Sequence, residues 1–184
     1  MESEFIEICK NNGIFTRIVP CALELLYAKD SGIYNQEYNQ ITNINTDGFE
    51  QWLERLKSKN KLDGDNEIIL EVLDQIYRKL ISIENLINKN EIKLYPLEKK
   101  GFISALGHGV ICTEIADFEV DVDYYLRFEL PVFPKRIVAI FGKAIDRRVV
   151  KITKMHQKNI EDFDMYIANK EMENLRLKHN TKDR

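Results

Sequence analysis

Hydrophobic residues follow two different spacings along the chain, and the change falls near residues 88–93. Before it, apolar positions recur at intervals of three and four, which is typical of amphipathic helices. Between residues 101 and 156 they form short runs rich in β-branched and aromatic residues, which indicates antiparallel strands. The pattern predicts an α+β protein with a helical region at residues 1–90 and a small antiparallel β-barrel with a C-terminal helix at residues 91–184.

The first part of the helical region has three segments. A cluster of apolar residues from Ile14 to Ala28 predicts a helix whose first turn accommodates Pro20. Residues 34–47, rich in Asn, Gln and Thr, predict a loop or a short irregular helix. Asp47 then suits the N-cap of a further helix, in which Trp52 is expected to anchor a core.

The strongest helical pattern runs from Asp65, a plausible N-cap, to Asn88. Its apolar residues form one stripe: Ile69, Val72, Leu73, Ile76, Leu80, Ile83 and Ile87. So broad a stripe predicts burial in an N-terminal bundle as its main role, and contact with a second subunit is the alternative. Lys79 interrupts a strict heptad, which favours a bundle over a long coiled coil.

The second half contains five candidate strands, preceded by an edge segment at residues 91–96 that Pro96 limits. The predicted strands are residues 101–104, 109–114, 124–130, 136–145 and 148–155. A helix is then expected from Asn159 to His179, with Ile160, Phe163 and Ile167 on one face.

Composition excludes several classes. The 184 residues are 44% hydrophobic and 31% charged, as in a globular protein. The 27 basic and 30 acidic side chains give a net charge of −3, which argues against nonspecific nucleic-acid binding. Cys9, Cys21 and Cys112 lack disulfide or zinc-ligand spacing. Residues 1–10 carry acids where a signal peptide needs bases, and no apolar run is long enough to span a bilayer, so a cytoplasmic location is expected.

Four groups of polar residues suggest chemistry, each with a plainer alternative. The glycines around His108 suit an anion site or, preferably, a β-turn, and His108 beside Ser104 suits a nucleophile and base but lacks a third orienting group. The acids Glu114, Asp117, Glu119, Asp121 and Asp123 lack EF-hand spacing, which favours a solvated loop. Basic residues follow two predicted strands and form either an anion-binding patch or protected edges: Lys135, Arg136, Lys143, Arg147, Arg148, Lys151 and Lys154.

The second half resembles a PilZ domain over about 85 residues. That family has an Asp/Asn-x-Ser-x-x-Gly turn and an apolar strand, a strand ending in Leu-Pro, a Gly-containing strand, a last strand and a C-terminal helix. This chain has ISALGHGVI at residues 103–111, FELP at 128–131, IFGKA at 140–144 and an apolar strand from Val149. Ser104 and Gly107 match the Ser-x-x-Gly turn, and Gly109 offers a second register.

Two departures concern the ligand of the family, cyclic di-GMP. The Arg-x-x-x-Arg pair that clamps its phosphates and guanines is absent, and Lys89 and Lys93, which share the spacing, lack the planar guanidinium fork. Phe102 stands where the family's Asp or Asn contacts guanine, and it accepts no hydrogen bond. The resemblance therefore implies a PilZ-like protein that does not bind cyclic di-GMP by the usual motif.

Two functions from different classes follow. In the first, the chain is a bacterial regulatory adapter without catalytic residues, metal or cofactor. Its expected partner is a protein, with the motility or flagellar apparatus as the example that the resemblance implies, and helix 65–88 is expected to support a homo-oligomer. In the second, it senses cyclic di-GMP or another nucleotide through Ser104, Gly107, Gly109, Arg147 and Arg148, with Lys89 and Lys93 as further cations. The second predicts saturable binding that weakens with salt.

Overall fold

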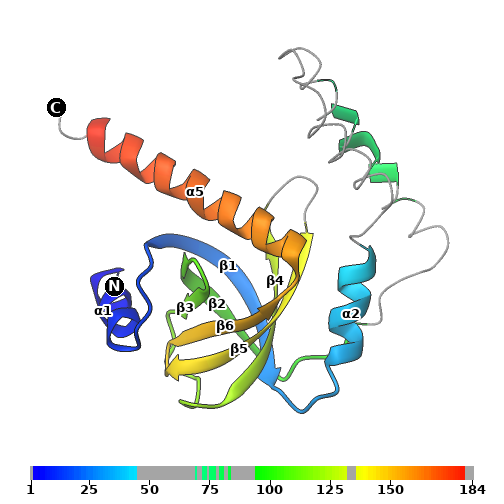
Figure 1. The fold of residues 1–184 in the computed structure, drawn as a ribbon, viewed down its shortest axis with the longest axis horizontal. Coiled ribbons are helices and arrows are strands. Elements are labelled where there is room, and N and C mark those ends of the chain that lie inside the picture. The colour runs from blue at the N-terminus through cyan, green and yellow to red at the C-terminus, as the bar shows by residue number, and fades with distance from the viewer. Residues whose placement is uncertain are drawn as a thin grey trace.

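The structure is a computed structural model that describes residues 2–44, 94–131 and 136–180, together with individual positions between residues 69 and 83. Strands and helices both contribute, so the predicted α+β class is confirmed (Figure 1). The helices are α1 (Glu2–Asn11), α2 (Asn35–Ile44) and α5 (Gln157–Asn180). The strands are β1 (Ile18–Lys29), β2 (Lys99–Gly107), β3 (Val110–Thr113), β4 (Asp123–Leu130), β5 (Arg136–Asp146) and β6 (Val149–Met155).

Within the described residues, the strands form one closed antiparallel barrel in the order β1-β2-β3-β6-β5-β4. Strand β1 completes the barrel because it pairs with β2 along one edge and with β4 along the other. Closure gives every strand a neighbour on both sides, so no strand of the barrel forms an open sheet edge. The predicted barrel and the five strands expected after residue 100 are confirmed.

Strand β1 corrects the prediction of a helix from Ile14 to Ala28. Leu23, Leu25 and Tyr27 alternate along this strand and all contribute to the buried core. Pro20, expected in a first helical turn, lies where the register with β2 shifts, a position at which a strand tolerates a residue without an N–H. The barrel thus takes a strand from the N-terminal side of the boundary drawn at residue 90.

Helix α5 packs against the barrel with its N-terminal half, as its apolar spacing predicted. Phe163, Tyr166 and Ile167 join the core formed by the strands, and the rings of Phe128 and Phe163 are 6.3 Å apart. The helix continues beyond this contact, and its C-terminal end extends past the barrel (Figure 1).

Two short helices cover parts of the outer surface of the barrel. Helix α1 buries Phe5 and Cys9 against residues of β1, β2, β3 and β6. Helix α2, in the stretch predicted as a loop or irregular helix, buries Tyr38 and Ile41 against β4 and β5. Neighbouring strands are therefore apolar on both faces at these places, inside toward the core and outside toward a helix.

The long helix predicted from residue 65 to 88 is not shown as one element. The positions described between residues 69 and 83 are helical, and the apolar residues among them are 47–57% exposed: Ile69, Val72, Leu73, Ile76, Leu80 and Ile83. The predicted burial of this stripe inside the chain is therefore wrong at these positions.

Three other predictions concern residues that are only partly described. Asp47 and Trp52 lie outside the described residues, as does the start of the edge segment at 91–93. The rest of that segment, from Leu94, has no regular secondary structure, so the edge strand is not confirmed.

Candidate functional site

The Ser-x-x-Gly turn is used by the barrel itself. The Ser104 hydroxyl donates a hydrogen bond to the Cys112 carbonyl oxygen at 3.3 Å, across the β2–β3 pair. Gly107 is buried at a point of close approach that leaves no room for a side chain. A Cβ there would lie 2.7 Å from the Arg17 carbonyl oxygen and 2.9 Å from Val110. Gly109 has a φ of 80° in the two-residue turn after β2, a conformation that favours glycine. Each residue has a structural role that explains its presence.

The two candidate arginines lie in the turn between β5 and β6. Arg147 donates a hydrogen bond to the Ala116 carbonyl oxygen at 3.3 Å. At one end of the β3–β6 pair, the backbone N–H of Ile152 donates a hydrogen bond to the Gly109 carbonyl oxygen. At the other end, the backbone N–H of Thr113 donates to the Arg148 carbonyl oxygen. The structure therefore places the arginines and the turn glycine Gly109 at opposite ends of β3. Ser104, which bonds to Cys112, lies toward the arginine end.

Helix α1 engages Arg148 directly. The guanidinium forms an ion pair with Glu4 and lies 5.4 Å from the centre of the Phe5 ring. The hydrogen bond that Arg148 donates to Glu4 raises the pKa of Arg148 and lowers the pKa of Glu4. A planar cation placed over an aromatic face and paired with a carboxylate is attracted to both, so this arginine already has a partner within the chain.

The other cations that the sequence singled out either make separate contacts within the chain or lie outside the described residues. Lys143 pairs with Asp121 at 3.1 Å, and its neighbour across β5 and β6 is another cation, Lys151. Lys154 lies over the rings of Tyr38 and Phe141. The side chains at residues 89, 93, 135 and 136 lie outside the described residues.

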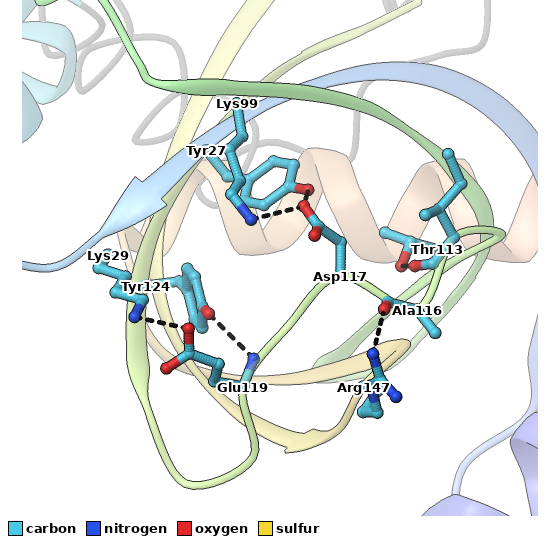
Figure 2. Close-up of polar contacts among 10 residues, drawn as sticks. Tyr27, Lys29, Lys99, Thr113, Ala116, Asp117, Glu119, Tyr124 and Arg147 are labelled. Carbon is cyan, nitrogen blue, oxygen red and sulfur yellow. Dashed lines mark hydrogen bonds and ion pairs between the residues drawn. The ribbon is translucent and has the colours of Figure 1, made fainter.

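The acidic series lies on the loop between β3 and β4 that covers one end of the barrel (Figure 2). Asp117 accepts hydrogen bonds from Tyr27 at 2.6 Å and from Lys99 at 2.8 Å. Glu119 pairs with Lys29 at 2.7 Å, and its backbone N–H donates to the Tyr124 hydroxyl at 3.0 Å. The bond from Lys99, followed by that from Tyr27, lowers the pKa of Asp117.

This loop closes the barrel around an aromatic side chain. Phe118 is 3% exposed, and its ring centre lies 5.0 Å from those of Tyr27 and Tyr124. The acids around it face lysines and tyrosines and do not converge on one point. No group of metal-ligating side chains occurs among the described residues, and the loop acts as a plug held by ion pairs.

Ser104 and His108 do not form a nucleophile and base. His108 Nδ1 lies 2.7 Å from Asp164 Oδ1 on α5, while Ser104 bonds to backbone. His108 therefore links the β2–β3 turn to α5. The cysteines are free, as expected from their spacing, and burial raises the pKa of Cys21 to about 12, which suppresses its thiolate.

Sequence patterns did not reveal a buried polar cluster between α2 and β4. Glu37, fully buried, accepts hydrogen bonds from the Tyr125 hydroxyl at 2.7 Å and from Arg127 at 2.6 Å. It also accepts one from the backbone N–H of Tyr95. The ring of Tyr34 stacks on that of Tyr125 with 4.8 Å between centres. The cluster joins both ends of the segment between β1 and β2 to the barrel wall.

The comparisons with known proteins give no relative. No protein-family model, no curated protein and no solved structure matches this chain. In the part of the chain that the structure describes, no helix is long and apolar enough to cross a membrane.

Proposed function

We propose that this chain is a non-enzymatic regulatory adapter of a bacterial cytoplasm, similar to PilZ proteins, that acts through protein contacts. The observation that carries the proposal is the internal use of the residues expected to hold a nucleotide. Ser104 bonds to Cys112, Arg147 to Ala116 and Arg148 to Glu4. A nucleotide would have to compete with each of these contacts.

A second observation supports protein contacts as the mode of action. Outside the barrel, the helical positions between residues 69 and 83 present large apolar side chains to solvent. Contiguous exposed apolar surface is uncommon on a monomer and marks interaction sites. The motility apparatus is the class of partner that the PilZ resemblance suggests.

The test is isothermal titration of the full chain with cyclic di-GMP. The adapter predicts no saturable heat at micromolar concentrations, whereas a nucleotide sensor predicts saturable binding that falls with salt. Arg148→Ala is the matched variant, because a sensor would lose affinity on loss of a guanidinium from its site. Saturable binding by the unaltered chain that Arg148→Ala weakens would overturn the adapter.

A further inference from the structure

The exposed apolar residues between 69 and 83 follow a heptad. Ile69, Leu73, Ile76, Leu80 and Ile83 are separated by alternating steps of four and three, and each is 47–57% exposed at a helical position. Alternating steps of this kind place side chains in one seam along a helix, the a and d positions of a coiled coil. We call these five residues the seam.

Lys79 does not interrupt this seam. In the heptad set by the seam, Val72 and Lys79 occupy the same flanking position, seven residues apart. Flanking positions of coiled coils commonly carry charged residues, because they lie at the border between the seam and water. The lysine that argued against a coiled coil in the sequence therefore fits one in this register.

The fold offers the seam no cover within the described chain. The segment that carries it leaves the barrel after Lys29 and returns at Lys99, and Tyr27 pairs with Lys99 where the two strands meet. The buried Glu37 cluster fixes this base to the outer wall of β4. The described seam residues are half-exposed, so no described part of the chain covers them.

Surface area and residue type indicate the occupant. Half-exposed side chains of this size offer roughly 500 Å² per chain, so two copies would bury only about 1,000 Å², the lower limit for a specific interface. The seam has leucine at a (Leu73, Leu80) and isoleucine at d (Ile69, Ile76, Ile83). In parallel coiled coils that arrangement favours three or four helices over two.

We infer that the seam binds the same seam of further copies of this chain, in a parallel, in-register bundle of more than two helices. The inference rests on the proposed adapter function, because it names the partner of its apolar helical surface. Identical residues meet in each layer of such a bundle, and each helix repeats the same contact with its neighbours until the ring closes. A parallel bundle of this kind would bring the barrels of all its chains together in one assembly.

Light scattering on the full chain tests the assembly. We expect the mass of three or four chains for the unaltered protein, and that of one chain for Ile76→Asp, because a carboxylate in the seam would be buried unpaired. Gln75→Asp is the matched control, since Gln75 is exposed beside the seam, and it should keep the assembly. Far-ultraviolet circular dichroism and thermal unfolding should show an intact barrel in both variants.

Disulfide crosslinking tests the parallel register. Ile83→Cys should form a covalent dimer under mild oxidation, because the same residue of a neighbouring copy lies in its layer, whereas Gln75→Cys and the unaltered chain should form little. A mass of one or two chains, or no crosslink through Ile83→Cys, would overturn the inference. An assembled chain that also binds cyclic di-GMP would overturn the adapter and leave the inference intact.

Discussion

Glu37 and Arg127 form a buried ion pair between α2 and β4, with exposed side-chain fractions of 0% and 8%. Both carboxylate oxygens of Glu37 accept further bonds, from Tyr125 and from the backbone of Tyr95. A buried charge is tolerated when its bonding capacity is filled in this way. The two residues depend on each other, because either charge alone would be left buried without its counter-charge.

Glu37→Gln should lower the free energy of unfolding by about 3 kcal/mol, because it leaves the Arg127 cation buried without its counter-charge. Urea denaturation monitored by fluorescence measures the loss. Glu24→Gln is the control, since Glu24 pairs with Lys100 on the surface and exposed pairs contribute below about 1 kcal/mol. Equal effects of the two substitutions would show that the buried pair is not a special source of stability.

At the scale of elements, the loop between β3 and β4 acts as part of the core although it has no regular secondary structure. Phe118 fills the barrel end between two tyrosines, and the flanking carboxylates pair with lysines of β1 and β2. The exposed ion pairs position the loop, while the buried ring supplies the larger contribution to stability.

Phe118→Ala should reduce the free energy of unfolding by about 3–4 kcal/mol, because it removes a buried ring and leaves a cavity. Ile115→Ala in the same loop is the control and should cost below about 0.5 kcal/mol, since Ile115 is 66% exposed. Chemical denaturation of both variants compares them. If the two losses are similar, the loop is not the plug of the barrel.

The elements that sequence patterns predicted well are those with one clear periodicity. Strands β2 to β6 and helix α5 have apolar runs or stripes bounded by turn residues and charges, and they lie where expected. Strand β1 was missed because helices cover its outer face near both ends. Ile18 packs under α1 and Ala28 under α2, while Val19 and Leu25 face the core, so period-two alternation is obscured.

The sites were less predictable than the fold because their partners are distant in sequence. Glu37 is one acid in a polar stretch, and its partners lie 58 and 90 residues away. Arg148 was recognised as a candidate ligand, but nothing in the local sequence indicated that Glu4 would neutralise it. Motifs locate residues of the right type, whereas tertiary contacts determine whether they are available.

At the scale of the whole molecule, the barrel and its covering helices enclose thiols and phenols whose neutral forms are favoured. Burial is the first cause of the raised pKa of Cys9, Cys21 and Cys112. Burial likewise raises the pKa of Tyr27 and Tyr125, aided by the hydrogen bonds that they donate to carboxylates. These groups keep their protons in the folded chain at pH values where the unfolded chain releases them.

Stability should therefore fall as pH rises above about 8.5, the ordinary pKa of a thiol, and more steeply above about 10, that of a phenol. Stability falls because the unfolded state binds fewer protons than the folded state in this range. Each group therefore lowers the free energy of unfolding by at most about 1.4 kcal/mol per pH unit. Urea denaturation at pH 7, 9 and 10 measures the slope. Cys112→Ala should make the free energy of unfolding depend less on pH between about 8.5 and 10, because it removes a buried thiol. A free energy of unfolding that stays constant from pH 7 to 10 would contradict the enclosure of these groups.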